Sequence, residues 1–295
     1  MVYSAKLIFD LVQQPFRSML FGFAFSPTLE INIMETSRLA HFFKSKLILL
    51  HVGEKTADKG HKINGILDRI EYEDLDFEVH WETGDPVETI LEASHSFNVD
   101  LLVLGAMQHE NVFTFYVGSI ARKLTRKVAC SVLLLVKPAA VRVPCQHVVV
   151  NGLDDPDTPV AIHRALYMAS VLGAKQVTIV EEIRQQEVQV TVEDDSSLRR
   201  ATLRKEKLKA REESRVQHIL EEMPEELTAG LSIKTQSIFG KRGYSIGHYA
   251  EVVRADLLVM NAPRKSGVLD RIFPHDIEYI LSDLPTDVLI IRNKS

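Results

Sequence analysis

The sequence predicts an α/β protein made of two tandem domains, each a doubly wound sheet of parallel strands. The chain repeats itself: residues 100–105 match 256–261 at an offset of 156, and the offset holds to the C-terminus, where 132–136 falls on 288–292. Within each copy, short apolar runs alternate with segments of helical period, which is the pattern of β-α-β units. A chain of 295 residues also has room for two domains of about 150 residues.

Five apolar runs in the first copy predict its strands. Because helices cover both faces of a parallel sheet, continuous apolar runs are expected there in place of an alternating pattern. Helix-start signals follow: Ser26 is expected to cap the first helix with Pro27 in its first turn, and Asp85 is expected to start another. A further helix is expected to begin near Ser119. The expected strands lie at 19–25, 46–52, 77–82, 101–105 and 131–136, and the Asp85 helix is expected to run to about Phe97.

The second copy carries an insertion. Upstream of the shared register the offset falls to about 130, since 47–51 matches 177–181, so about 26 extra residues lie between 181 and 231. They indicate a charged helix, with eight basic and three acidic side chains between Arg199 and Arg215. Such a run usually faces solvent, and an anionic partner is the alternative. We therefore expect domain 1 at 1–140 with an N-terminal extension at 1–14, domain 2 at 141–295, a charged helical insertion at about 184–226, and an extra edge strand around Val188, Val190 and Val192.

Composition excludes several classes of protein. The net charge of −5 divides into about −3 for 1–140 and about −2 for the rest, so neither half is a basic body and no nucleic-acid partner is expected. The two cysteines, Cys130 and Cys145, are too few for a disulfide framework or a structural zinc site. No apolar run reaches the roughly 18 residues that a membrane span needs. These features are typical of a cytoplasmic protein without a membrane segment.

The tips of the strands are where a ligand is expected, because in open parallel sheets ligands bind beyond the carboxyl ends of the strands. The fourth strand of the first copy ends at Gly105, and thirteen positions later Gly118 and Ser119 open a helix. A helix N-terminus offers unpaired N–H groups, a glycine lets a ligand approach the backbone, and a serine hydroxyl donates to a phosphate oxygen. The spacing favours a phosphate site, and a tight turn followed by an ordinary helix start is the alternative.

These motifs resemble those of the universal stress protein family, in tandem over nearly the whole chain. Nucleotide-binding members carry G-x2-G-x9-G-[S/T] after the fourth strand, where this sequence has Gly105, Gln108, Gly118 and Ser119. Further family-like segments lie at 49–52, 84–86, 100–105 and 130–132. The resemblance implies two flavodoxin-like, adenine-nucleotide alpha-hydrolase-like domains, each a five-stranded parallel doubly wound sheet of order 3-2-1-4-5. It also implies an intramolecular pseudo-dimer that pairs 132–136 with 288–292, and it leaves a further homo-oligomer open.

The sequence departs from the family's nucleotide motif in both copies. Binding members have an aspartate at the end of the first strand and a second glycine in the loop, where this chain has Ala24 and Gln108. In the second copy, Pro274 lacks the N–H that a phosphate would need. The family pattern therefore implies ATP or another adenine nucleotide in the first copy only. Its expected site is Ala24, Val52, Gly105, Gln108, Gly118 and Ser119, and the degenerate second site is Leu153, Asn261, Arg264, Pro274 and His275.

Catalysis and metal binding have no motif in this sequence. The eleven histidines form no H-x-x-x-H or H-E-x-x-H pattern, and no serine stands in G-x-S-x-G. We expect no metal site and no catalytic residues, and we predict a binding or regulatory module in a stress response. Two alternatives stay open: an interaction-only scaffold that binds no nucleotide, and a weak ATPase.

Overall fold

A computed structural model describes residues 14–108, 115–184, 187, 193–262 and 275–293. The chain divides into two compact units, with Met1–Pro144 and Thr286–Ser295 in unit 1 and Cys145–Pro285 in unit 2. The last strand of the chain therefore groups with unit 1, whereas the sequence analysis placed all of 141–295 in one domain. The predicted extension at 1–14 and the edge strand at 188–192 lie almost wholly outside the described residues.

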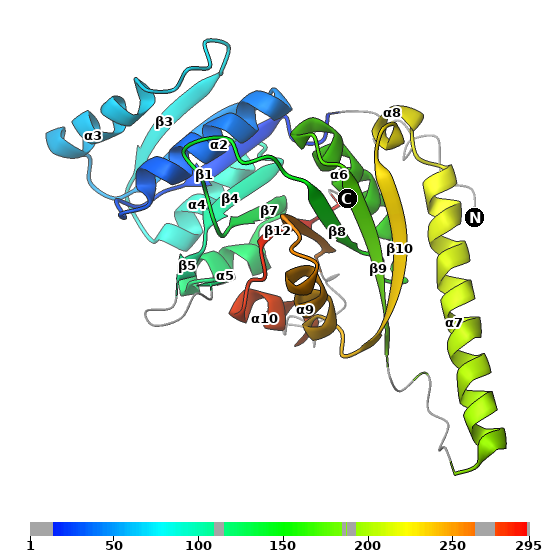
Figure 1. Ribbon diagram of the computed structural model, residues 1–295. Helices are drawn as coiled ribbons and strands as arrows, with labels where there is room; N and C mark the ends of the chain where they lie inside the picture. The colour runs from blue at the N-terminus through cyan, green and yellow to red at the C-terminus, as the bar shows by residue number, and fades with distance from the viewer. Residues whose placement is uncertain (1–13, 109–114, 185–186, 188–192, 263–274, 294–295) are drawn as a thin grey trace. The chain divides into compact units, whose positions relative to one another are not determined.

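Unit 1 is built on a parallel sheet (Figure 1). Its own strands follow the order β3-β2-β1-β4-β7, which confirms the predicted 3-2-1-4-5. The C-terminal strand β12 (Asp287–Ile291) pairs antiparallel with β7, with Leu289 opposite Leu133. A small hairpin of β5 and β6 stands apart from this sheet. The remaining elements are β1 (Ser18–Gly22), α2 (Leu29–Phe43), β2 (Lys46–Val52), α3 (Ala57–Leu67), β3 (Phe77–Glu82), α4 (Pro86–Ser96), β4 (Leu101–Gly105), β5 (Met107–Gln108), β6 (Phe115–Tyr116), α5 (Ser119–Lys127) and β7 (Ser131–Leu135).

The first strand and the first helix differ from the sequence prediction. β1 ends at Gly22, and α2 begins at Leu29 with Thr28 as its N-cap, so Ser26 is not the cap. The reason is a turn after the strand: the Ser26 N–H donates to the Ala24 carbonyl at 2.8 Å, and Pro27 lies before the helix. The other expected starts are confirmed: the Asp85 carboxylate accepts from the N–H groups of the residues that follow Pro86, and α5 starts at Ser119.

Unit 2 repeats the architecture of unit 1. Its strands pair in parallel in the order β10-β9-β8-β11, the arrangement of β3-β2-β1-β4 in unit 1. These four strands therefore have the same topology as the first four strands of unit 1, as the internal repeat predicts. The elements are β8 (His147–Asn151), α6 (Thr158–Leu172), β9 (Gln176–Arg184), α7 (Asp195–Glu221), α8 (Glu225–Thr228), β10 (Ser232–Gly240), α9 (Tyr244–Val252), β11 (Leu257–Asn261) and α10 (His275–Ser282).

The insertion of unit 2 contains the 27-residue helix α7, which runs alongside β10 (Figure 1). Its start is fixed by a capping box, in which Asp194 accepts from the Ser197 N–H and the Ser197 hydroxyl accepts from the Asp194 N–H. A thin stripe that includes Val216 and Ile219 is buried, and most of the charged side chains face solvent. One exception is Glu212, a buried carboxylate in the second half of the helix.

The central strands form the core of each unit. Leu20, Leu102 and Leu134 of unit 1 are fully buried, as are Val149 and Leu258 of unit 2. Continuous apolar strands of this kind are expected where helices cover both faces of a sheet. Among the described helices, none combines the length and the apolar character that a bilayer crossing requires.

Candidate functional site

The N-terminus of α5 lies after the fourth strand of unit 1, where the sequence predicts a phosphate site. Gly118 is the N-cap, no side chain caps the helix there, and the first turn has no acidic residue. Ser119 is exposed as the first helical residue. Backbone N–H groups at such an end have no partner within the helix and carry part of the positive pole of the helix dipole. This end of α5 is therefore suited to an anion.

The loop between β4 and α5 turns back on itself through the small hairpin. Met107 pairs with Tyr116 and Gln108 with Phe115, so Gln108, the departure from the family loop, lies on β5 beside Met107. A Cβ atom at Gly118 would lie 2.7 Å from the Met107 sulfur, which means that glycine permits this close approach. Met107 is 51% exposed and flexible, and Gln108 is exposed. A ligand at α5 would therefore meet a movable methionine next to the glycine.

Gly105, the last residue of β4, lies next to the buried side-chain amide of Asn32. Asn32 of α2 donates through Nδ2 to the Thr28 carbonyl at 2.9 Å and to the Thr28 hydroxyl at 3.1 Å. Its Oδ1 has no hydrogen-bond partner among the described residues, and it would lie 3.4 Å from a Cβ at Gly105. A buried acceptor without a donor is costly, so Asn32 Oδ1 is a ready acceptor for a ligand N–H or O–H.

Aromatic side chains gather at the tips of the first three strands. Phe23, Phe25, His51 and Trp81 form this aromatic cluster, with ring centroids 4.9 to 6.3 Å apart. His51 Nδ1 lies 3.0 Å from the Phe23 carbonyl, and its Nε2 has no hydrogen-bond partner among the described residues. Two lysine ammonium groups cover the cluster, Lys55 at 5.7 Å from the Trp81 ring and Lys59 at 5.5 Å from the Phe25 ring.

The remaining two residues predicted for the first site lie beside these rings. Ala24 is exposed and lies two residues after the end of β1, and Val52 ends β2 and is half-buried. The tip of the first two strands is therefore apolar and aromatic with a cationic rim, and it offers no carboxylate where binding members carry an aspartate.

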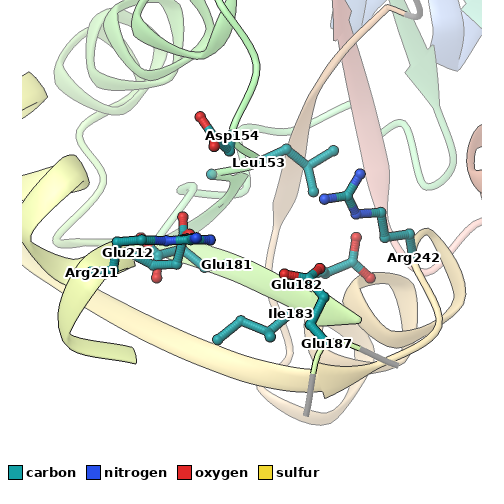
Figure 2. Close-up of a pocket in the computed structure, with 10 residues that line it drawn as sticks. Leu153, Asp154, Glu181, Glu182, Ile183, Glu187, Arg211, Glu212 and Arg242 are labelled. Atoms are coloured by element: carbon teal, nitrogen blue, oxygen red, sulfur yellow. Dashed lines mark hydrogen bonds and ion pairs between the residues drawn. The ribbon is translucent and has the colours of Figure 1, made fainter. Parts of the chain in front are cut away.

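The same position in unit 2 holds a cavity of quite different chemistry (Figure 2). The cavity has a volume of about 140 Å³ and lies at the carboxyl ends of β8 and β9. Leu153 and Ile183 form an apolar part of its wall. The charged lining is mostly acidic and comprises Asp154, Glu181, Glu182, Glu187, Glu212, Arg211 and Arg242.

Glu182 closes one side of this cavity by binding a helix. At the offset of 130 it takes the place of Val52. Its carboxylate accepts from the Gly243 N–H at 3.1 Å and from the Ile246 N–H at 2.9 Å, at the start of α9. Gly243 has a φ of 78°, a left-handed conformation that glycine adopts without strain. A carboxylate of the chain thus occupies a helix N-terminus that would otherwise suit an anionic ligand.

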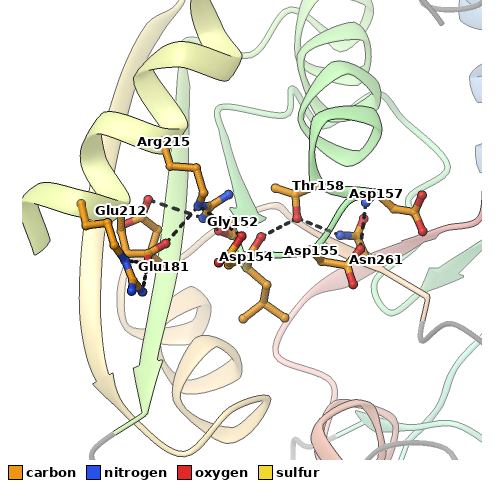
Figure 3. A network of polar contacts seen from close by, with 11 residues as sticks. Gly152, Asp154, Asp155, Asp157, Thr158, Glu181, Glu212, Arg215 and Asn261 are labelled. Carbon is orange, nitrogen blue, oxygen red and sulfur yellow. Dashed lines mark hydrogen bonds and ion pairs between the residues drawn. The ribbon is translucent and has the colours of Figure 1, made fainter. Parts of the chain in front are cut away.

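Arg215 of the insertion helix joins three groups at the second site (Figure 3). Its guanidinium donates through Nη2 to the Gly152 carbonyl and through Nε to Glu212 Oε2 at 3.0 Å. Its Nη2 lies 3.9 Å from Glu181 Oε1. Glu212 also pairs with Arg211, whose Nε donates at 2.9 Å. These two arginines hold the pKa of Glu212 below its usual range even though burial opposes them.

Glu181 is the least compensated carboxylate of the second site. It takes the place of His51 and is 2% exposed. Its Oε2 accepts from the Ser237 hydroxyl at 3.2 Å, and its Oε1 has no hydrogen bond within the described part of the chain. Burial raises the pKa of Glu181 to about 7, and the nearby Arg215 charge opposes the rise. A group buried in this way is stabilised by a proton or by a cation.

The predicted second-site residues are only partly described. Leu153 lies in the wall of the cavity. Asn261 ends β11, and its Nδ2 donates to the Thr158 hydroxyl at 3.1 Å. Arg264 and Pro274 lie outside the described residues, and His275 is described only as the first residue of α10.

Glu181 and Glu182, which dominate the second site, are not among the residues predicted from the sequence. The signal was present, because the register that aligns 47–51 with 177–181 ends an apolar strand on Glu181 and Glu182. Carboxylates at the buried tip of a strand are unusual and indicate a site or an ion pair. The described residues contain no group of three or more His, Cys, Asp or Glu side chains arranged to hold a metal ion.

The parallel doubly wound sheet of order β3-β2-β1-β4-β7 defines a flavodoxin-like domain. Residues 15–136 match the family model described as "Universal stress protein family". Unit 1 is therefore a universal stress protein domain, as the sequence predicts.

Solved structures with the same fold cover both units. A functionally unknown protein from Pseudomonas aeruginosa PAO1 has a TM-score of 0.69 at 16% identity, with 95% of this chain and 94% of that chain covered. A universal stress protein from Archaeoglobus fulgidus DSM 4304 has a TM-score of 0.60 at 16% identity, covering 95% and 99%. At 16% sequence identity, these structural similarities show a shared fold and nothing further. The comparison with curated proteins returned no match.

Proposed function

We propose that the protein is a non-catalytic binding module of the universal stress type, which takes an adenine nucleotide in unit 1 only. The observation that carries the proposal is the uncapped N-terminus of α5 at Gly118 and Ser119. Phosphate is favoured at such an end by the unpaired N–H groups and by the helix dipole. The family membership of unit 1 supports the same ligand class.

The rest of the first site supports a nucleotide in place of a simple anion. Asn32 Oδ1 beside Gly105 is a buried acceptor for a ribose hydroxyl or a base amine. The aromatic cluster offers apolar ring surface at the strand tips, and Lys55 and Lys59 add positive charge. In the described part of unit 2, carboxylates line the cavity at the corresponding strand tips, and they repel phosphate.

Binding without catalysis is the second part of the proposal. Phosphate hydrolysis needs a group that positions or deprotonates the attacking water, usually with a metal ion held near the phosphates. Among the described residues around this end, the first turn of α5 holds no acidic side chain, and Gly105, Met107 and Gln108 are not bases. Phosphate release above that of a Ser119→Ala variant would contradict this part and favour the weak ATPase.

The Ser119→Asp variant tests the site. A carboxylate in the first turn stabilises the helix by about 0.3–1 kcal/mol, but it repels phosphate. The variant should therefore unfold at a slightly higher temperature without ligand and lose the stabilisation that ATP gives the wild type, which is roughly 2.7 kcal/mol at a hundred times Kd. Ser119→Asn is the neutral control and should keep most of the ATP effect.

Two results would overturn the proposal. If the wild type gains no thermal stability with millimolar ATP or AMP, the protein is better described as an interaction-only scaffold. If Ser119→Asp keeps the full ATP effect, the nucleotide lies elsewhere. The compartment belongs to the same proposal, and we place the protein in the cytoplasm. An internal pseudo-dimer also stays a proposal: β12 pairs with β7, the two final strands that the repeat aligns, and both strands lie in unit 1.

A further inference from the structure

The cavity of unit 2 points to a second ligand class. We propose that it binds a small organic cation, an alkylammonium or guanidinium group, with the charged head on Glu181 and the carbon chain against Leu153 and Ile183. This inference is independent of the nucleotide site in unit 1, since every residue that carries it lies in unit 2.

The charge balance of the lining selects a cation. Five carboxylates line the cavity against the two guanidinium groups of Arg211 and Arg242. Two of these carboxylates are already engaged, Glu212 by Arg211 and Arg215, and Glu182 by the N-terminus of α9. The three carboxylates that remain are Glu181 inside and Asp154 and Glu187 in the rest of the lining (Figure 2). They stand against the guanidinium of Arg242, with Arg215 Nε 4.0 Å from Asp154 Oδ1, so negative charge remains in excess.

Glu181 supplies the specific contact. Its Oε1 is buried in the cavity wall and has no hydrogen bond among the described residues, and the nearest cation, Arg215 Nη2, stands 3.9 Å away. Leaving a buried acceptor without a donor costs free energy, and more so when it is charged. An ammonium or guanidinium N–H at this oxygen would supply both the missing donor and a neutralising charge.

The size and the walls of the cavity limit the rest of the ligand. A volume of about 140 Å³ is close to that of a cavity that holds benzene, so about six non-hydrogen atoms fit. Leu153 and the buried Ile183 suit methylene groups. Leu153 stands where binding members of the family have an aspartate, so the change that weakens an adenine site supplies an apolar wall here. Phosphate groups are disfavoured by the carboxylates.

The test uses the full chain and four probes of matched size. Butylammonium and methylguanidinium chloride should raise the unfolding temperature in a concentration-dependent way and give saturable heats in calorimetry. Butanol and sodium butyrate, at the same ionic strength, should do neither. No response to the two cations would overturn the proposal, and so would an equal response to butyrate, which would indicate an anion site at Arg242.

Three variants test whether butylammonium binds in the cavity of unit 2. Glu181→Gln should weaken butylammonium binding by about 10- to 100-fold, the value of a hydrogen bond to a charged group. Leu153→Trp should block the cavity while it leaves every charge in place, so it tests the site even if Glu181→Gln folds poorly. Glu226→Gln, on the exposed face of α8, removes the same charge away from the cavity and should bind like the wild type. Equal affinity in all three variants would refute the assignment. The ATP effect of Ser119→Asp is measured separately, so either proposal can fail alone.

Discussion

Arg215 donates through Nε to Glu212 at 3.0 Å, and the two residues lie three positions apart on α7. The same guanidinium reaches the Gly152 carbonyl at the tip of β8, so the pair ties the insertion to the sheet of unit 2 (Figure 3). The insertion is therefore more than a solvated helix. Its second half forms one wall of the cavity, and its arginines compensate the carboxylates there.

Replacing Arg215 by methionine should destabilise unit 2 strongly. The arginine side chain is 22% exposed, and its carboxylate partners Glu212 and Glu181 are nearly buried. Removing the cation of a buried pair leaves uncompensated charge, at a cost of about 3–5 kcal/mol. Urea unfolding followed by circular dichroism measures the loss.

Arg211→Met is the matched control for Arg215→Met. Arg211 pairs with the same carboxylate, but its side chain is 61% exposed, so the loss should stay below about 1 kcal/mol. Equal losses in the two variants would contradict the role given to Arg215.

His163 on α6 should make unit 2 sensitive to acid. Its side chain is buried, and neither ring nitrogen has a hydrogen-bond partner among the described residues. Burial, with a smaller contribution from the charge of Arg164, lowers the pKa of His163 to about 4 from 6.5. As the pH falls, His163 therefore takes up a proton in the unfolded chain at a higher pH than in the folded protein. The contribution of neutral His163 is complete above pH 6.5 and is lost as the pH falls towards 4, by up to about 3 kcal/mol.

The variant His163→Leu isolates that effect. The difference in unfolding free energy between variant and wild type should shift in favour of the variant as the pH falls from 6.5 to 4, and it should be constant above pH 7. Chemical denaturation at several pH values measures it. A difference that does not change with pH would show that folding does not shift the pKa of His163.

The contribution of Glu181 to stability should depend on pH with the opposite sign to that of His163. Because burial raises its pKa to about 7 from 4.5, the folded protein holds this proton more tightly than the unfolded chain. The stabilising contribution is complete below pH 4.5 and is lost as the pH rises to 7. Glu181→Gln should therefore gain stability relative to the wild type over that range, by up to about 3 kcal/mol. A flat Glu181→Gln profile would rule out the raised pKa.

The apolar runs of the first copy predicted its sheet well. The bounds of β2, β3 and β4 agree with the sequence. β2 and β4 are buried strands that stay mostly apolar along their length, whereas β3 is a partly exposed edge strand in which apolar and polar residues alternate. The start of α2 was harder, since Ser26, Thr28 and Pro27 all suit a helix start. Thr28 becomes the N-cap because of a turn in which the Ser26 N–H bonds to the Ala24 carbonyl. The capping preferences of single residue types do not predict that turn.

The site was less predictable because its partners come from distant parts of the chain. Gly105 and the helix start at Gly118 follow from a local motif. The contact of Glu182 with the start of α9 joins residues about 60 positions apart, and so does the bond between Arg215 and Gly152. Such contacts depend on how β9 and α7 pack. The internal repeat helps to locate site residues, because the sequence alone aligns Glu181 with His51, a residue at the tip of a strand.

The C-terminal strand should hold the last turn of α5 in unit 1. Arg292 follows β12, and its Nη2 donates to the Thr125 carbonyl at 2.8 Å and to the Arg126 carbonyl at 3.2 Å. These carbonyls belong to the end of α5, where a cation also meets the negative pole of the helix dipole. Arg292→Met should therefore lower the unfolding free energy of unit 1 by about 1–3 kcal/mol and speed hydrogen exchange of the α5 amides.

Lys127→Met is the control. It removes a basic side chain from the same turn, but the ion pair of Lys127 with Glu88 is exposed, so the variant should change exchange little. If both variants exchange alike, the strand does not hold the helix through Arg292. If only Arg292→Met speeds exchange, the strand that pairs with β7 also supports the helix that offers its N-terminus to phosphate.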